Sequence, residues 1–276
     1  MKYCRFLFED QALYGKVEDR AGEPWIVDLI VDLAAAPEED LAFRLAHERA
    51  TSWSFDFEPM PLSAAKLLPP VTPSKIVCVG RNYRDHAKEL GNEVPAEPLL
   101  FFKPPSSLLA PGGVVLMPLS STRVDFEGEL AIVIGHRVSK LKPDADWRSV
   151  VRGYTVANDV TARDLQKKDS QWTRAKGFDT FCPVGPMVSD EVNPEAGLTV
   201  ETRVNGELRQ HGSTADFIFS IPALLSYITA AITLEPGDLV LTGTPAGVGP
   251  LAAGDRVEVA ISGLGVLANT VQADKS

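Results

Sequence analysis

Residues 124–134 read VDFEGELAIVI and form the most informative stretch of the chain. Successive side chains of a β-strand point to opposite faces, so Glu127 and Glu129 are expected to lie side by side on one face. The residues that follow are apolar on both faces: Leu130 and Ile132 on one, Ala131 on the other. The pattern therefore predicts a strand that is buried on both sides.

Two neighbouring carboxylates in a buried strand need compensation. They repel each other and lack solvent, so either one of them is protonated or a cation offsets both. Because no Cys or His stands near Glu127 and Glu129, oxygen ligands favour a hard ion, Mg²⁺ first, with Mn²⁺ or Ca²⁺ as alternatives. The competing interpretation is an edge strand with two solvated glutamates.

The N-terminal part has the pattern of a small β-rich module. Apolar runs at 3–8, 12–17 and 25–29 alternate with turn residues, and a helix is predicted near 38–50. The run LPPVTP at 68–73 then resists both helix and strand, because proline removes a donor and restricts the residue before it. We therefore expect a small N-terminal domain over 1–70 and a larger, catalytic domain over 71–276.

The larger part is also predicted to be rich in strands. The dipeptide Asn205-Gly206 is typical of a type I′ hairpin turn. The irregular spacing of the elements favours a mostly antiparallel fold over a βαβ alternation. Helices are expected at 84–90, 162–172 and 220–231, and strands at 75–79, 99–102, 114–117, 124–134, 154–158, 198–204, 239–241, 257–261 and 264–271.

Composition excludes several classes of protein. The 276 residues carry 27 Lys and Arg against 37 Asp and Glu, a formal net charge of −10, which argues against binding to nucleic acid or to an anionic membrane. Three separated cysteines and no visible export signal make a cytoplasmic location the expectation. The uncharged stretch 217–234 contains Pro222 and several hydroxyl side chains, and therefore predicts a buried helix.

Further polar residues could complete a site. Asp159 follows a predicted strand and could be a third metal ligand or simply a helix cap. Arg163 and Gln166 share a helix face and could reach what Asp159 holds. His86 and Glu89 also share a helix face, so the glutamate could orient the imidazole as a general base, although a solvated surface pair is the commoner occurrence.

Two lysines and one threonine are weaker candidates. Lys103 and Lys176 stand among apolar residues and could bind an anion or form a Schiff base, or they could reach the surface with only their stems buried. Thr244, in the glycine-rich run 241–250, could contact a carboxylate. The glycine spacing of that run is similar to a dinucleotide-binding fingerprint. Such a site requires a helix directly after the glycines, but here Pro250 and a predicted strand follow, which argues against nucleotide binding.

Six motifs in order carry a family resemblance: GRNYRDH at 80–86, FFKP at 101–104, DFEGEL at 125–130, NDVTARDLQ at 158–166, WTRAKGFD at 172–179 and LTGTPAGVG at 241–249. Over about 73–271 the chain resembles the fumarylacetoacetate hydrolase superfamily, in particular its short acylpyruvase-like branch. The resemblance implies an α+β, mainly β fold: a mixed β-sandwich roll as catalytic domain, preceded by a small β-rich domain, commonly as a homodimer.

The resemblance also implies roles for individual residues. Glu127, Glu129 and Asp159 would be the metal ligands. His86 and Glu89 would be catalytic and carried on a lid helix that orders when ligand binds. Lys176 would contact the substrate and assist catalysis, and further substrate contacts would come from Arg81, Tyr83, Arg163, Gln166 and Thr244.

One departure bears on the substrate. The larger members of the family carry an additional aspartate seven residues before the histidine, where this chain has Val79. A smaller acylpyruvate is therefore a more plausible substrate than fumarylacetoacetate. The absence of a serine elbow, a phosphate-binding lysine loop and a zinc HExxH motif disfavours three other hydrolytic or transfer chemistries.

The expected activity is Mg²⁺-dependent cleavage of a C–C bond in a 2,4-dioxo acid such as fumarylpyruvate or acetylpyruvate. The bond would break through an enolate chelated by the metal. The same site could instead serve oxaloacetate decarboxylation or tautomerisation, or isomerisation of 2-hydroxyhepta-2,4-diene-1,7-dioate in aromatic catabolism. A non-catalytic binder of dicarboxylates is the alternative from another class of protein.

Overall fold

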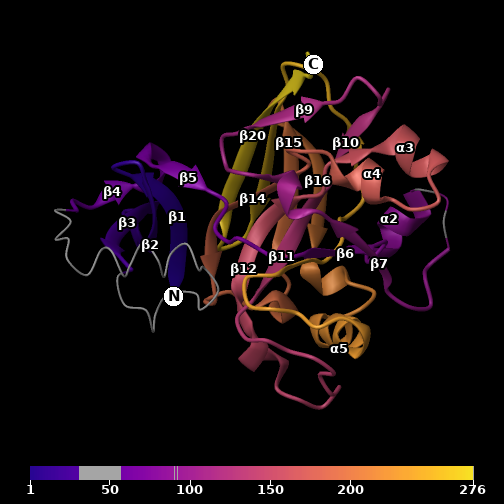
Figure 1. The fold of residues 1–276 in the computed structure, drawn as a ribbon, viewed down its shortest axis with the longest axis horizontal. Coiled ribbons are helices and arrows are strands. Elements are labelled where there is room, and N and C mark those ends of the chain that lie inside the picture. Colours follow the sequence, from indigo (N-terminus) through magenta and orange to yellow (C-terminus); the bar gives the residue numbers. More distant parts are fainter. Residues whose placement is uncertain (31–56, 90, 92, 276) are drawn as a thin grey trace.

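A large mixed sheet runs through the molecule. The computed structural model describes residues 1–30, 57–89, 91 and 93–275, and the helix predicted at 38–50 lies outside them. The strand order of the sheet is β4-β3-β2-β1-β14-β12-β11-β17-β6-β7, with β5 beside β1 and β8 beside β14 (Figure 1). Its strands in the larger part of the molecule are β6 (Ile76–Gly80), β7 (Leu99–Lys103), β8 (Leu108–Leu109), β11 (Gly128–Ile134), β12 (Val151–Asn158), β14 (Cys182–Ser189) and β17 (Leu239–Leu241).

Two smaller sheets complete the larger part. A five-stranded sheet has the order β16-β15-β19-β20-β9, and a three-stranded one has the order β13-β10-β18. Their strands are β9 (Val114–Met117), β10 (Val124–Phe126), β13 (Thr161–Ala162), β15 (Thr199–Val204), β16 (Glu207–Ser213), β18 (Gly249–Pro250), β19 (Arg256–Ile261) and β20 (Gly265–Ala273). Most neighbouring strands are antiparallel, as predicted, and the pairs β8–β14, β6–β17 and β9–β20 are parallel.

Helices are few in the described part of the chain. They are α2 (Arg84–Glu89), α3 (Arg163–Lys168), α4 (Thr173–Gly177) and α5 (Ile221–Ala231), with short 3-10 turns at Leu62–Ala64, Pro105–Ser107, Trp147–Val150, Pro194–Ala196 and Thr214–Asp216. The helices α2 and α5 occupy the positions that the sequence predicts. Pro222 lies in the first turn of α5, where its missing N–H costs no hydrogen bond.

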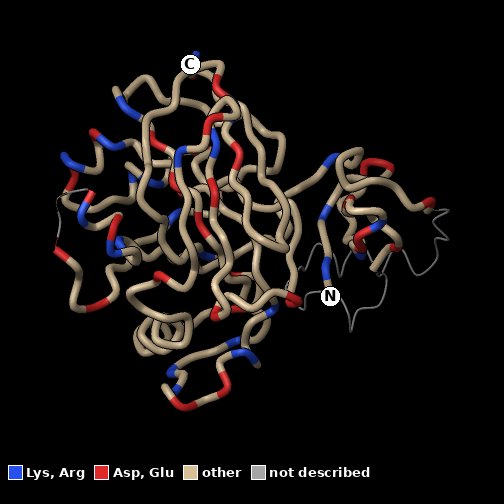
Figure 2. The backbone as a smooth tube through the Cα atoms, turned by 180° about the vertical axis from the view of Figure 1, so that it is seen from behind, with Lys and Arg blue, Asp and Glu red and all other residues tan. Residues whose placement is uncertain are grey.

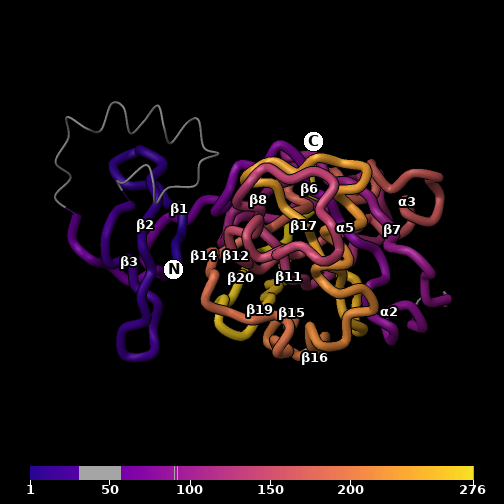
Figure 3. The backbone as a smooth tube through the Cα atoms, turned by 90° about the horizontal axis from the view of Figure 1, so that it is seen from below, coloured from indigo at the N-terminus to yellow at the C-terminus, as the bar shows by residue number. Residues whose placement is uncertain are grey.

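The N-terminal strands form a separate lobe beside the larger part (Figures 1 and 3). They are β1 (Lys2–Phe8), β2 (Gln11–Arg20), β3 (Glu23–Leu29), β4 (Met60–Pro61) and β5 (Lys66–Leu68). The lobe joins the large sheet where β1 pairs with β14, with Lys2 opposite Ser189 and Tyr3 opposite Val188. The proline-rich run 68–73 lies between β5 and β6.

Strand β11 is buried on both faces, as predicted. Leu130 and Ile132 belong to the core between the large sheet, the five-stranded sheet and α5. Ala131 and Val133 belong to a second core on the opposite face. The fold is therefore α+β and mainly β, and every residue of β11 is buried.

Two predicted elements are interrupted in the structure. The strand predicted over 124–134 breaks at Glu127, because the Glu127 N–H donates to Asn158 Oδ1 (2.9 Å) and β10 pairs into another sheet. The helix predicted over 162–172 ends at Lys168, and a second helix, α4, begins at Thr173.

One central strand was missed. Strand β14 contains Pro183, Gly185 and Pro186, which are residues that weaken any strand prediction from sequence. The hairpin predicted at 205–206 is confirmed: Asn205 and Gly206 both have positive φ, 53° and 83°, as a type I′ turn requires.

Acidic and basic residues are interspersed along the backbone of both parts of the molecule (Figure 2). Among the described residues, no helix is long and apolar enough to cross a membrane.

Gly128 is a close contact between the two larger sheets. A Cβ at this position would overlap Thr202 Oγ1 and lie 2.9 Å from Val259 Cγ1. We therefore expect Gly128→Ala to lower the free energy of unfolding by about 1–3 kcal/mol through overpacking, measured by denaturant titration. The matched control is Gly249→Ala, whose added methyl would meet no atom closer than 3.3 Å and should change stability little. Equal stability of the two variants would contradict the close approach at Gly128.

Candidate active site

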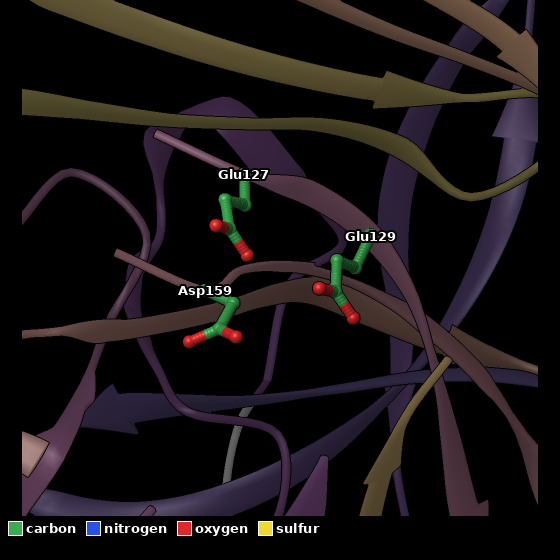
Figure 4. Close-up of side chains that lie close together, drawn as sticks. All are labelled: Glu127, Glu129 and Asp159. Atoms are coloured by element: carbon green, nitrogen blue, oxygen red, sulfur yellow. The ribbon is translucent and has the colours of Figure 1, made fainter. Parts of the chain in front are cut away.

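Three carboxylates meet at one edge of the large sheet. Glu127 immediately precedes β11, Glu129 is its second residue, and Asp159 follows β12. Because Gly128 pairs with Asn158 across the antiparallel strands, the three side chains come together (Figure 4). One ligand oxygen from each residue lies within 4.8 Å of the others, and the residues are only 5%, 2% and 0% exposed.

Basic side chains compensate two of the three carboxylates. Lys176 Nζ donates to Asp159 Oδ2 (2.6 Å) and to Glu127 Oε2 (2.9 Å). Lys103 Nζ donates to Asp159 Oδ1 (2.6 Å), and Arg163 Nη2 donates to Glu127 Oε1 (2.6 Å). All three basic residues are buried, so these are charge-assisted bonds in a place of low dielectric.

Glu129 is the carboxylate without a basic partner among the described residues. Its Oε2 accepts a hydrogen bond from the Gly243 N–H (2.7 Å). Burial raises the pKa of the Glu129 carboxyl well above its ordinary value, and the charges of Asp159 and Glu127 raise it further. Without a bound cation, burial and the two neighbouring charges therefore both disfavour the ionised form of Glu129.

Glu127 and Lys176 are held in their charged forms. Burial alone would raise the pKa of the Glu127 carboxyl, but the charges of Lys176 and Arg163 lower it well below its ordinary value. Burial would likewise lower the pKa of Lys176, but Asp159 and Glu127 raise it overall. A lysine kept protonated in this way is a poor nucleophile, which argues against a Schiff base at Lys176.

The three oxygen ligands fit a hard divalent cation. They are all carboxylates, they converge, and one of them, Glu129, has no counter-charge among the described residues. A dication would offset the repulsion that Asp159 and Glu127 exert on Glu129 in this buried place. The identity of the ion is not set by this chemistry alone, because Mg²⁺, Mn²⁺ and Ca²⁺ all prefer oxygen ligands.

His86 and Glu89 form the pair that the sequence suggested. His86 Nδ1 lies 3.2 Å from Glu89 Oε2 on helix α2. The Glu89 carboxylate also accepts the Gly247 N–H, at 3.1 and 3.2 Å to its two oxygens, from the glycine-rich loop. The helix is thus tied to that loop, and the His86 ring is oriented by a carboxylate that is itself held.

A cavity of about 300 Å³ joins these groups. It is lined by the carboxylate triad and by His86. Five of the expected substrate contacts also line it: Arg81, Arg163, Gln166, Lys176 and Thr244. The remaining lining residues are Val79, Gly80, Phe101, Lys167 and Trp172. Phe101 and Trp172 form an edge-to-face pair with ring centroids 5.3 Å apart. The cavity therefore combines charged groups with an aromatic wall.

Two expected site residues, Glu89 and Tyr83, do not line this cavity. Glu89 lies behind His86, to which it is bonded. Tyr83 is buried, packs edge-to-face on Phe217, and borders a different hollow of about 360 Å³. Two other residues have less freedom than expected. Thr244 donates its hydroxyl hydrogen to the Gly128 C=O (2.8 Å), and Gln166 Oε1 accepts from Arg163 Nη1 (2.7 Å).

Supporting residues were missed by sequence reasoning. Gln210 accepts the Gly128 N–H (2.9 Å) and donates to Thr244 Oγ1 (2.7 Å), so it ties the start of β11 to the glycine-rich loop. Lys103 was predicted to be an anion binder, a Schiff-base lysine or a surface lysine, but it is 1% exposed and bonded to Asp159. A buried glutamine in the polar strand β16 carries no local signal of this kind.

The site combines convergent buried carboxylates with a histidine that a carboxylate orients, around one cavity. These are features of an enzyme active site rather than of a structural ion-pair cluster. The family model described as "Fumarylacetoacetate (FAA) hydrolase C-terminal" matches residues 75–272. The chain belongs to the fumarylacetoacetate hydrolase superfamily, whose members are enzymes.

Relatives within the family have several activities in their names. The chain is 44% identical to oxaloacetate tautomerase YisK of Bacillus subtilis over 76% of this chain and 74% of that one. It is 46% identical to the mitochondrial oxaloacetate decarboxylase of Dictyostelium discoideum over 70% and 91% of the two chains. A crystal structure of 2-hydroxyhepta-2,4-diene-1,7-dioate isomerase from Mycobacterium marinum superposes with a TM-score of 0.84 at 38% identity, over the whole of both chains.

Metal binding should release a proton. The pKa of Glu129 is raised when no cation is bound, and a ligand must be deprotonated, so the affinity for Mg²⁺ should rise with pH until Glu129 ionises by itself. Calorimetric titrations in buffers of different ionisation enthalpy should show release of close to one proton per ion at pH values below the raised pKa. Asp144→Asn, which removes an exposed carboxylate elsewhere, should leave this release unchanged. Binding of Mg²⁺ with no proton release would contradict the assignment.

Proposed function

We propose that the protein is a metal-dependent enzyme that acts on a small 2-oxo acid by stabilising negative charge on the 2-oxo oxygen. The observation that carries this proposal is that the carboxylate triad and His86, whose ring is bonded to Glu89, line one cavity. Glu127, Glu129 and Asp159 would hold the ion, with Mg²⁺ the first candidate and Mn²⁺ or Ca²⁺ the alternatives. When bound, the ion would act as a Lewis acid toward the carboxylate and 2-oxo oxygens of the substrate.

The basic residues orient the triad. Lys176 spans Glu127 and Asp159, while Lys103 and Arg163 each hold one of them from another side. Each of the two carboxylates therefore has both oxygens bonded, which limits its rotation. Preorganised charges of this kind do not need to rearrange when charge develops on the substrate.

His86 is suited to proton transfer. With Nδ1–H donated to Glu89, the Nε2 atom is left with a lone pair that can accept a proton. In hydrolysis of a 2,4-dioxo acid, His86 would take a proton from water as the oxygen attacks the C4 carbonyl. The C3–C4 bond then breaks, and its electron pair passes to the 2-oxo group, which leaves as the enolate of pyruvate. Return of the proton from His86 to C3 gives pyruvate, and the other product is a carboxylic acid. This C–C hydrolysis is our first candidate reaction.

Oxaloacetate tautomerisation or decarboxylation is the second candidate, favoured by the names of the two relatives at 44% and 46% identity. Both reactions develop negative charge on the same 2-oxo oxygen. Tautomerisation requires proton transfer at C3, and decarboxylation requires no activated water. Isomerisation of a 2-hydroxy-dienoate, the activity for which the M. marinum protein is named, also moves a proton next to that oxygen.

Loss of a metal ligand should abolish turnover on every substrate. Glu129→Ala removes one of the three carboxylates, and we expect a fall in kcat of roughly a thousandfold or more, since Lewis-acid stabilisation supplies several kcal/mol. Activity should be assayed on acetylpyruvate, fumarylpyruvate and oxaloacetate with added Mg²⁺ and with EDTA. The exposed Asp144→Ala serves as control. Undiminished activity in EDTA would overturn the proposal.

Loss of the imidazole should separate the two candidates. His86→Ala should reduce acylpyruvate hydrolysis by about 10²- to 10⁴-fold, the usual contribution of a general base, while oxaloacetate decarboxylation should persist. Lys88→Ala, on the exposed side of the same helix, should alter neither rate. If the wild-type protein cleaves no acylpyruvate but turns over oxaloacetate, the first candidate is wrong and the second stands.

A further inference from the structure

Two of the four basic side chains that line the active cavity have no partner among the described residues. Arg163 and Lys176 are bonded to the carboxylate triad. The side chains of Arg81 and Lys167 line the same cavity but, within the described part of the chain, form neither a hydrogen bond nor an ion pair. The cavity therefore has positive charge beyond what its own carboxylates bind.

Arg81 is also held in a strained backbone conformation. Its φ of 58° lies in the left-handed region, which non-glycine residues other than Asn and Asp seldom adopt. It follows directly on β6 and lies three residues before α2, where the chain turns into the cavity rim. Strain of this kind persists only where neighbouring structure imposes it, and it is concentrated at functional sites.

The residue that imposes this conformation is Asn82. Its Nδ2 donates to the Thr242 C=O (2.9 Å) and the Phe219 C=O (3.2 Å), and its Oδ1 accepts the Phe219 N–H (2.8 Å). Gly243 lies so close that a Cβ there would be 2.8 Å from Asn82 Cβ. The fully buried Asn82 thus anchors the turn and fixes where the Arg81 side chain begins.

Lys167 lacks such a support. It lies on the six-residue helix α3 and is exposed to solvent. Of the two unpaired cations, Arg81 is therefore the one whose position is built into the fold, and a guanidinium can form two parallel hydrogen bonds with a carboxylate.

We infer that Arg81 binds a second carboxylate of the substrate, at the end remote from the 2-oxo acid group, and thereby selects dicarboxylic over monocarboxylic substrates. The inference rests on the proposed function, in which the 2-oxo acid end is taken by the triad and its ion. The aromatic wall of Phe101 and Trp172 provides an apolar surface in the same cavity for the carbon chain between the two ends.

The test compares ligands that differ only at the remote end. Affinities are measured by calorimetry with Mg²⁺ present for three pairs of equal chain length: oxaloacetate and 2-oxobutanoate, 2-oxoglutarate and 2-oxopentanoate, 2-oxoadipate and 2-oxohexanoate. Oxalate, which has no remote end, reports on the metal-binding end alone. At the best chain length, we expect the dicarboxylate to bind roughly ten- to a hundredfold more tightly, as for one charge-assisted pair.

Variants assign this preference to Arg81. Arg81→Asn removes the charge but suits the left-handed backbone, so it should fold, keep its affinity for oxalate, and lose the preference for dicarboxylates. Arg81→Lys should restore part of the preference. Lys168→Asn, on the same helix as Lys167 but outside the cavity lining, is the control and should keep all of it.

Each other outcome is decisive. If oxalate fails to bind with Mg²⁺, the proposed function itself is wrong. If oxalate binds but no dicarboxylate is preferred at any length, only the inference about Arg81 is wrong. The inference is also overturned if Arg81→Asn weakens oxalate as much as the dicarboxylates, or if Lys167→Asn abolishes the preference while Arg81→Asn preserves it.

Discussion

Three carboxylates with almost no solvent contact repel one another where β11 begins and β12 ends, and the surrounding basic side chains compensate that repulsion. An isolated buried charge costs several kcal/mol, so each one needs a partner. Lys103, Lys176 and Arg163 come from three separate segments to meet Glu127 and Asp159. Glu129 has no basic partner in the described part of the chain, and this asymmetry suits the cluster to a cation better than a closed network of ion pairs would.

The two halves of the site differ in how firmly they are held. The triad stands on central strands whose backbone is braced by Gln210, Asn158 and Thr244. His86 stands on a six-residue helix attached to the glycine-rich loop through Glu89. The triad would bind one end of the substrate at a fixed position. His86, on its short and separately attached helix, would then accept a proton at the reacting end.

The local charge of the cavity differs from that of the whole chain. The protein carries a formal net charge of −10, yet the cavity brings four basic residues and, with a divalent ion, would favour anionic ligands. Two of those basic residues, Arg163 and Lys176, are bonded to the carboxylates of the triad. Arg81, whose backbone is anchored by the buried Asn82 and whose side chain has no partner in the described part of the chain, would then link the fold to the choice among substrates.

The sequence by itself determined the β-rich class, the double-sided burial of 128–134 and the turn at 205–206, because periodicity and turn chemistry are local. The grouping of the carboxylates with His86 and Glu89 came instead from the family resemblance, which six motifs spread over 80–249 carry. Only the tertiary structure decided which polar groups meet. The break at Glu127, the burial of Lys103 against Asp159 and the brace from Gln210 depend on contacts between residues 31, 56 and 82 positions apart. No local pattern encodes such pairings, since a buried polar side chain is stabilised by whichever distant partner the packed sheets bring to it.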